Sequence, residues 1–228
     1  MAEAVKRARR YDSPRRREQA AATRRAILEA AQRLFEEQGY AATSVSDIAK
    51  AAGVALKTVY VGFDTKAGLL RVLWDERLSG DEADIPVTER AWYRGVLEEA
   101  DPERKLRLVA VQSRVVKTRS GALMEVIRNA AAADSEIAKL WVDIKTKLYD
   151  VSRSIVEQLH QNDALTSALD VTAATDVLWT LNHPSVWQLL VAERGWAAEQ
   201  YEEWLGGNLC SQLLREPHRA GSDEIGGG

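Results

Sequence analysis

The amino-acid sequence predicts an all-α protein, and three observations favour this fold class. Apolar residues recur at spacings of three and four along most of the 228-residue chain, which is typical of helices with one buried face. Several of these stretches begin at a capping residue and end near a glycine. No stretch of the sequence shows the alternation of apolar and polar residues that a strand requires, and no tight-turn pair typical of a β-hairpin occurs.

The first helices are defined by their ends. A helix is expected from Thr23, and Gly39 ends it because glycine adopts a left-handed conformation at low cost. A second, short helix begins after Ser44, where Ser44 and Asp47 have the spacing of a capping box, and it ends at Gly53. The third and fourth helices are expected at about 56–61 and 65–78.

The rest of the chain continues in helices after one break. Residues 80–90 are polar and contain a proline, so they predict a loop. Asp101 followed by Pro102 is a strong helix start. The longest apolar stripe follows Asp134. Helices are expected at about 88–98, 101–119, 121–131, 134–161, 170–182, 184–193 and 197–215.

Composition excludes several classes of protein. The single cysteine, Cys210, cannot form an intramolecular disulfide, and we expect it to be a small buried side chain in a reducing compartment. No apolar run approaches the roughly 18 residues that a membrane helix needs. The basic N-terminus is not followed by the apolar segment of a secretory signal. We therefore expect a cytoplasmic protein without a membrane partner.

Charge is distributed unevenly along the chain. Residues 1–66 carry 13 Lys and Arg against 8 Asp and Glu, whereas residues 67–228 carry 18 against 26. A basic end joined to an acidic body indicates that the N-terminal end meets a polyanion. All seven tryptophans lie in the acidic part, where we expect the aromatic core and any pocket for an organic molecule.

Residues 44–63 have the pattern of a helix-turn-helix unit, because two short helices flank a tight turn at Gly53. The run over 43–70, together with the apolar pattern of 27–40, closely resembles the DNA-binding domain of the TetR family of transcriptional repressors. The C-terminal part, through residues 194–205, resembles the ligand-binding and dimerisation domain of the same family more loosely.

This resemblance implies which residues meet double-stranded DNA. The third helix would lie in the major groove and read bases, while Tyr60 and Lys66 would contact the backbone. The start of the second helix would face phosphates. Lys57 and Lys66 have a second interpretation as ordinary solvated lysines. The implied DNA-binding residues are Thr43, Ser44, Ser46, Leu56, Lys57, Thr58, Tyr60 and Lys66, joined by Arg15, Arg16 and Arg17 before the first helix.

Two residues depart from the family pattern. Gly62 stands where histidine or another large polar residue is usual, which removes a phosphate contact. Leu56 stands where a polar residue is common, which favours an apolar contact such as a thymine methyl group. Both changes leave the operator sequence open. The basic residues before residue 18 are either a solvated tail or an arm that binds phosphates or a minor groove.

These patterns divide the chain into four parts. Residues 1–19 are expected to be a basic disordered arm, and residues 20–66 a three-helix DNA-binding domain with a helix-turn-helix. Residues 67–216 are expected to be a helical ligand-binding and dimerisation bundle. Residues 217–228 are expected to be a flexible tail.

The acidic part carries no recognisable catalytic pattern. Its three histidines, His160, His183 and His218, lack the spacing of metal ligands, and no nucleophile, phosphate-binding or dinucleotide motif occurs in the sequence. We therefore expect no catalytic residues, no metal and no cofactor, and a protein that is not an enzyme.

The resemblance implies a small-molecule pocket in the bundle. For any one of the apolar candidates, plain core packing is the competing interpretation. Arg128 differs, because a buried arginine needs an anionic partner, which would be a ligand carboxylate, Glu125 or an acid on the next helix. The ligand-binding candidates are Met124, Arg128, Trp141, Ile144, Lys145, Leu148 and Trp179.

The last helices carry more apolar residues than one buried face requires. They are expected either to form a two-fold interface or to pack inside one chain. Two chains would place two reading helices on a near-palindromic site. The candidate interface residues are Val186, Leu190, Tyr201, Trp204, Leu205, Leu209 and Leu213.

Together these features predict a homodimeric, ligand-responsive repressor that a small molecule releases from its operator. Two other classes remain open. One is a small-molecule-binding protein or enzyme with a vestigial DNA-binding head, and the other is an architectural protein that binds DNA without sequence specificity. The intact pattern over 57–66 argues against both.

Overall fold

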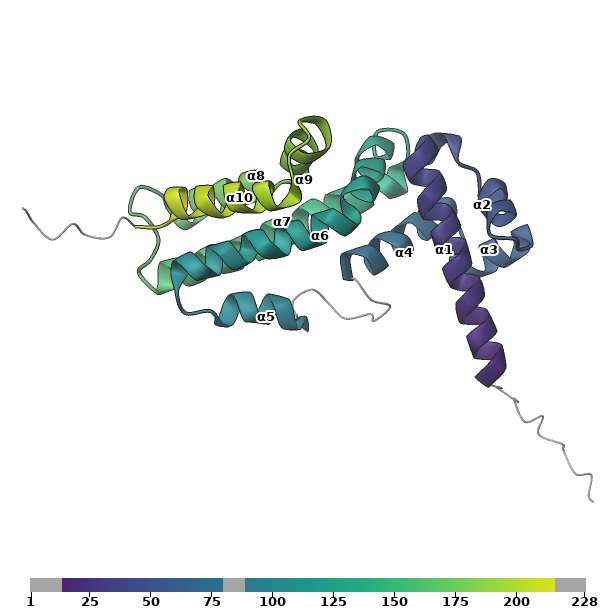
Figure 1. Ribbon diagram of the computed structural model, residues 1–228, viewed down its shortest axis with the longest axis horizontal. Helices are drawn as coiled ribbons and strands as arrows, with labels where there is room; N and C mark the ends of the chain where they lie inside the picture. Colours follow the sequence, from purple (N-terminus) through teal and green to yellow (C-terminus); the bar gives the residue numbers. More distant parts are fainter. Residues whose placement is uncertain (1–13, 80–88, 216–228) are drawn as a thin grey trace, which may run out of the picture. The chain divides into compact units, whose positions relative to one another are not determined.

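The computed structural model describes residues 14–79 and 89–215 of the chain, and within them helices are the regular structure (Figure 1). The chain divides into two compact units, Met1–Leu73 and Trp74–Gly228, and α4 runs from the first into the second. The first unit holds α1 (Pro14–Ala42), α2 (Val45–Ala51), α3 (Leu56–Phe63) and the start of α4 (Lys66–Ser79). The second holds α5 (Ala91–Glu98), α6 (Pro102–Ala130), α7 (Ser135–Gln161), α8 (Val171–Leu181), α9 (Pro184–Trp187), the π-helical η2 (Gln188–Glu193) and α10 (Ala198–Leu213).

The core of the N-terminal unit forms where α1 meets the two short helices. Phe35 on α1, Ile48 on α2 and Val59 on α3 are all buried, as are Leu69 and Leu70 on α4. These positions follow the spacing of three and four that predicted the helices. The buried side chains fix which face of each short helix is turned outward.

The prediction of a disordered arm over residues 1–19 is wrong for residues 14–19. These residues form the first turns of α1. Pro14 suits a first helical position, and the arginines, glutamine and alanines after it are good helix formers. The segment carries no apolar face, so hydrophobic periodicity gave no signal of a helix there. Residues 1–13 of the predicted arm and the predicted tail at 217–228 lie outside the described residues.

Two of the expected helices in the C-terminal unit are one. The segments 101–119 and 121–131 form the continuous helix α6, and Gly121 lies inside it. A glycine in mid-helix is unfavourable by roughly 0.5–1 kcal/mol relative to alanine, so a break was a natural expectation. Here the glycine has a packing role, because a Cβ on it would lie 2.9 Å from Nε1 of Trp187.

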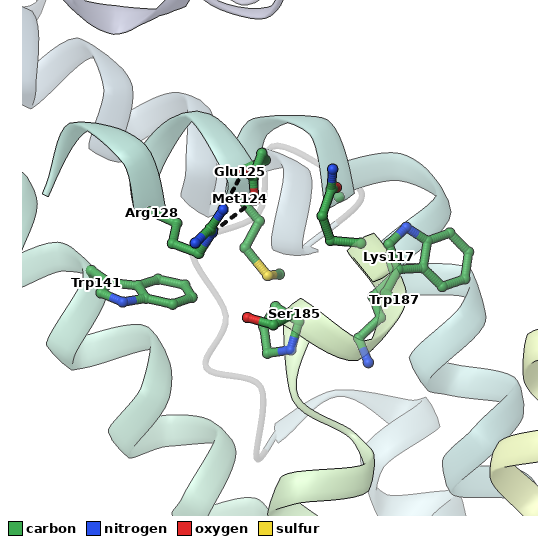
Figure 2. Close-up of a pocket in the computed structure, with 10 residues that line it drawn as sticks. Lys117, Met124, Glu125, Arg128, Trp141, Ser185 and Trp187 are labelled. Carbon is green, nitrogen blue, oxygen red and sulfur yellow. Dashed lines mark hydrogen bonds and ion pairs between the residues drawn. The ribbon is translucent and has the colours of Figure 1, made fainter. Parts of the chain in front are cut away.

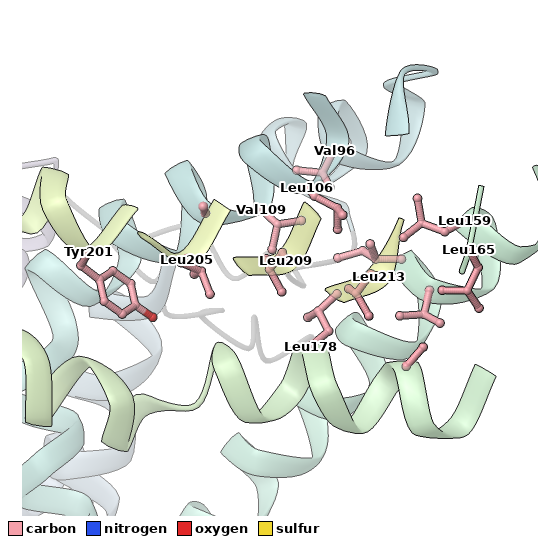
Figure 3. Packing of buried hydrophobic residues seen from close by; sticks show 14 of the residues in the cluster. Val96, Leu106, Val109, Leu159, Leu165, Leu178, Tyr201, Leu205, Leu209 and Leu213 are labelled. Carbon is pink, nitrogen blue, oxygen red and sulfur yellow. The ribbon is translucent and has the colours of Figure 1, made fainter. Parts of the chain in front are cut away.

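The main hydrophobic core lies between α10, α6 and α8 (Figure 3). Leu205, Leu209 and Leu213 project from α10 into it, and all three have no exposed surface. Leu178 on α8 and Leu106 on α6 pack against the same cluster. One face of α10 is thus buried in the core of a single chain.

This burial corrects the predicted dimer interface. Four of its seven candidate residues, Tyr201, Leu205, Leu209 and Leu213, are fully buried within one chain and have no surface to offer a partner. The apolar excess on the last helices is used inside the bundle, as the competing interpretation held. Val186, Leu190 and Trp204 are partly buried and keep some exposed surface.

Candidate nucleic-acid interface and pocket

A capping box fixes the start of α2, as the spacing of Ser44 and Asp47 predicts. The backbone N–H of Asp47 donates to Oγ of Ser44 (3.1 Å), and the backbone N–H of Ser44 donates to Oδ2 of Asp47 (3.2 Å). The Ser44 hydroxyl also donates to that carboxylate (2.5 Å), and these bonds lower the pKa of Asp47. Ser44 and Ser46 are exposed beside this cap.

The corner between α1 and α2 holds two residues that were expected to face DNA. Thr43 is buried, and its Oγ1 lies within hydrogen-bonding distance of the carbonyl oxygens of Gly39 (2.9 Å) and Leu34 (3.1 Å). Its prediction as a phosphate contact is therefore wrong, because the hydroxyl closes the end of α1 instead.

Lys66 also points into this corner. Its ammonium donates to the carbonyl oxygens of Tyr40 (2.9 Å) and Thr43 (3.1 Å) and lies 4.0 Å from the centroid of the Tyr40 ring. These contacts join the start of α4 to the end of α1. Lys66 thus has a structural role in this unit, which the sequence alone did not indicate.

The outward face of α3 is unusually apolar. Val59 and Phe63 are buried and turn the remaining positions outward, where Leu56 is 43%, Tyr60 49% and Val61 79% exposed. The cap residue of α3, Ala55, offers no side-chain hydrogen bond to the first N–H groups. Lys57, Thr58 and Gly62 complete this exposed face. Val61 was not predicted from the sequence as part of this face, because its side chain has no polar group that would indicate contact with DNA.

The start of α1 adds positive charge. Arg15, Arg16 and Arg17 are exposed in its first turns, and that turn contains no acidic residue. Basic side chains at a helix N-terminus oppose the helix dipole, so a polyanion there would relieve the repulsion. The first turns of α1 are therefore suited to phosphate groups.

A pocket lies on α6 where α7, α9 and the start of η2 approach it (Figure 2). Figure 2 shows the Met124 side chain extending between Trp141 and Trp187, with Ser185 facing it. The cavity volume is about 10 Å³, which is about the room that one water molecule needs. A larger molecule can enter only if side chains move, and methionine is well suited to do so. The lining residues are Lys117, Gly121, Met124, Glu125, Arg128, Trp141, Pro184, Ser185, Trp187 and Gln188.

Three of the seven predicted ligand-binding residues, Met124, Arg128 and Trp141, line this pocket. The other four, Ile144, Lys145, Leu148 and Trp179, do not. Lys145 lies over the ring of Trp141, 5.6 Å from its centroid, and Trp179 packs edge-on against His183. Of these four residues, Lys145 thus contacts a lining residue of the pocket, Trp141.

Arg128 is exposed, so the expectation of a buried arginine was wrong, and it has an acidic partner within its own helix. Its guanidinium donates to both carboxylate oxygens of Glu125, from Nε at 2.8 Å and from Nη2 at 2.5 Å. Of the three partners considered for this arginine, the structure places Glu125 against it. The pair raises the pKa of Arg128 and lowers that of Glu125 through the same hydrogen bonds.

Lys117 is the pocket residue that sequence reasoning missed. It is buried, and its ammonium donates to the backbone carbonyl and Oδ1 of Asn182 (both 2.8 Å) and to Oη of Tyr201 (2.7 Å). Burial holds the pKa of Lys117 well below its usual value and raises that of Tyr201 to about 12. A detectable signal was its place on the apolar stripe of α6.

Replacing Gly121 with alanine is expected to disturb the pocket. The new Cβ would lie 2.9 Å from Nε1 of Trp187, so the indole must shift. We expect a loss of about 1 kcal/mol in unfolding free energy and a change in tryptophan fluorescence. Gly207→Ala on α10 is the control, since a Cβ there meets nothing within 4 Å. Equal effects of the two substitutions on fluorescence would contradict the packing described.

The described part of the chain contains no group of three or more His, Cys, Asp or Glu side chains placed to hold a metal ion. Among the same residues, no helix combines the length and apolar character needed to cross a bilayer.

Comparison with known proteins agrees with this geometry. Residues 27–73 match the model for bacterial regulatory proteins of the tetR family. The HTH-type transcriptional regulator AcrR of Shigella flexneri is 33% identical over 125 residues, which cover 54% of this chain and 55% of AcrR. The alignment thus spans about half the length of that relative.

Solved structures share the fold of this chain. The regulator FadR from Bacillus subtilis, in complex with stearoyl-CoA, has a TM-score of 0.66 at 23% identity, covering 82% of this chain and 97% of FadR. A transcriptional regulator from Saccharomonospora viridis, in complex with choline, has a TM-score of 0.67 at 16% identity, covering 86% and 100% of the two chains. The helix-turn-helix residues thus match the tetR family of bacterial regulatory proteins, and the chain shares the fold of these solved regulators.

Proposed function

We propose that the protein is a ligand-responsive DNA-binding regulator, a homodimeric repressor in the cytoplasm that a small molecule releases from its operator. The observation that carries the proposal is the outward face of α3. This short helix follows α2, which begins with a capping box, and its outward side chains are exposed. The FadR and choline-bound neighbours, each solved with a small molecule, support a ligand-responsive bundle.

On DNA, α3 would enter the major groove. Lys57 supplies a positive charge for a phosphate or a guanine edge, while Leu56 and Val61 suit thymine methyl groups. The Tyr60 hydroxyl is exposed and can donate to a phosphate. Ser44, Ser46 and the arginines of α1 would bind the flanking backbone.

One recognition helix of eight residues reads few base pairs, so a second copy is needed. The surface still open for pairing on the last helices includes Val186, Leu190 and Trp204, which are partly buried in one chain. Leu189 on η2 is 53% exposed and adds to it. We therefore assign the dimer contact to this surface instead of the buried face of α10.

A direct connection between the pocket and α4 supports a release mechanism. Arg119 lies on α6 between the pocket residues Lys117 and Gly121, and its guanidinium donates to the carbonyl oxygens of Arg77 (2.7 Å) and Leu78 (2.5 Å) near the end of α4. A ligand that displaces α6 would thus pull on α4, which continues into the DNA-binding unit. Only a ligand with different affinities for two positions of α4 can shift their populations.

The proposal is tested by selecting tight binders from random duplexes, then measuring affinity at two salt concentrations. We expect a near-palindromic site bound by one dimer, with random DNA weaker by about 10³-fold or more. Equal and steeply salt-dependent binding to all duplexes would instead show an architectural binder and contradict the proposal.

Replacing Lys57 with alanine should weaken binding to the selected site and to altered sites alike if it contacts phosphate, and the salt dependence should fall by about one unit of slope. Lys147→Ala, an exposed lysine on α7, is the control and should change neither. A Lys57 variant with the affinity and salt slope of the unaltered protein would remove α3 from the interface.

A further inference from the structure

The pocket on α6 combines apolar walls with positive charge. Its lining residues include two cations, Lys117 and Arg128, and one acid, Glu125, which is paired with Arg128. Lys117 is the cation left over. Its three hydrogen-bond acceptors, two oxygens of Asn182 and the Tyr201 hydroxyl, are neutral, so its bonds are made but its charge is not balanced.

The surroundings of His183 point to the same positive field. Burial lowers the pKa of this imidazole, and the charges of Lys117, Lys145 and Arg128 lower it further. Two acids, Glu125 and Glu193, lie near these cations, and their charges raise the pKa of Arg128. Positive charge thus gathers at one place in a part of the chain that is acidic as a whole.

A second buried lysine on α6 can be compared with Lys117. Lys105 lies on the same helix and is also buried, with its ammonium donating to the carbonyl oxygen of Leu97 (2.9 Å) and to Oε1 of Gln158 (2.5 Å). The charge of Glu99 acts on Lys105 and favours its charged form, whereas burial is the cause that lowers the pKa of Lys117. Lys105 is also not among the residues that line the pocket on α6.

We propose that the pocket on α6 takes an anionic small molecule with an apolar body, whose negative group is neutralised by the Lys117 ammonium. This rests on the proposed function, because the molecule would be the effector. Trp141 and Trp187 would face its apolar body, and Met124 would move aside to admit it. A negative group in a water-poor site gains more from an unbalanced cation than it would in solvent.

Binding would also change the contacts that Lys117 makes. All three N–H groups of the ammonium already donate hydrogen bonds. An anion must therefore replace one of its acceptors, on Asn182 or Tyr201. Those residues follow α8 and lie on α10, respectively. The effector would therefore loosen the contact of α6 with both helices while it binds.

The test uses the full chain and three carboxylates, benzoate, 2-naphthoate and decanoate, each paired with its amide and its primary amine. Calorimetry and tryptophan fluorescence report binding without DNA. We expect at least one carboxylate to bind about 10-fold to 100-fold more tightly than its amide, and the amines to bind no better than the amides. Amides or amines that bind as well as the carboxylates, or no carboxylate binding at about 1 mM, would overturn the proposal.

Variants assign the preference to Lys117. Lys117→Met should remove the difference between carboxylate and amide, and Lys105→Met should keep it. Tyr201→Phe, which removes one competing acceptor and keeps the ring, should tighten carboxylate binding by about 2-fold to 10-fold, and it decides the question if Lys117→Met does not fold. An unchanged preference in Lys117→Met, or weaker binding in Tyr201→Phe, would refute the assignment.

The same ligands are then added to the protein on its selected DNA site. Carboxylate binding through Lys117 that leaves DNA affinity unchanged would refute the proposed regulation while supporting this site. Release of DNA by an amine that binds without Lys117 would support the proposed regulation and refute this site.

Discussion

Replacing Leu209 with alanine is expected to lower the free energy of unfolding by about 2–5 kcal/mol. The side chain has no exposed surface and sits in the cluster formed by α10, α6 and α8. Removing it deletes buried apolar contacts and leaves a cavity that the helices fill only in part. Urea unfolding followed by circular dichroism measures the loss.

The same experiment separates the core from a dimer interface. Val142→Ala, at an exposed position on α7 outside the proposed dimer surface, should change the unfolding free energy by no more than about 0.5 kcal/mol. A core residue shifts the midpoint equally at high and low protein concentration, whereas an interface residue loses its effect when the dimer dissociates. A Leu209→Ala effect that disappears on dilution would contradict the burial described.

Replacing Gly39 with alanine is the second large effect, an expected loss of about 1–3 kcal/mol in the stability of the DNA-binding unit. Gly39 has φ 81° and ψ 164°, a conformation that residues with a Cβ rarely adopt. A methyl group would meet nothing within 4 Å, so the cost is backbone strain rather than a clash. The corner between α1 and α2 that Thr43 and Lys66 close depends on this turn.

Gly62→Ala is the matched control for this substitution. Gly62 lies within α3, has equally open space around its Cα and lacks a positive φ, so alanine there should raise helix stability by about 0.5–1 kcal/mol. Differential scanning calorimetry should therefore show opposite changes in the melting temperature. A Gly39→Ala protein that melts with the unaltered one would show that the corner adopts another conformation.

The parts of the fold that follow from local chemistry could be predicted from sequence. The capping box at Ser44 and Asp47 is confirmed, because both partners and their spacing are local. The start of α1 could not be found in this way, since residues 14–19 bury nothing and leave no periodic signal. The break expected near Gly121 was wrong because the partner that requires a glycine, Trp187, lies 66 residues further along the chain.

The candidate site was less accessible to sequence reasoning, for a related reason. Spacing shows that Leu205 and Leu209 share a face with Tyr201, but not whether that face meets the same chain or another. Thr43 and Lys66 have side chains that suit phosphates, yet they are used by nearby carbonyl groups. Lys117 becomes notable only when the fold shows that its partners, Asn182 and Tyr201, are neutral.

The apolar surface of α3 has a thermodynamic consequence. Covering Leu56, Tyr60 and Val61 in a groove would remove apolar area from water, and such burial lowers the heat capacity. Contacts of the α1 arginines with phosphates release counterions and add little to that quantity. The heat-capacity change of binding, measured by calorimetry at several temperatures, should thus be clearly negative on the operator and close to zero on random DNA.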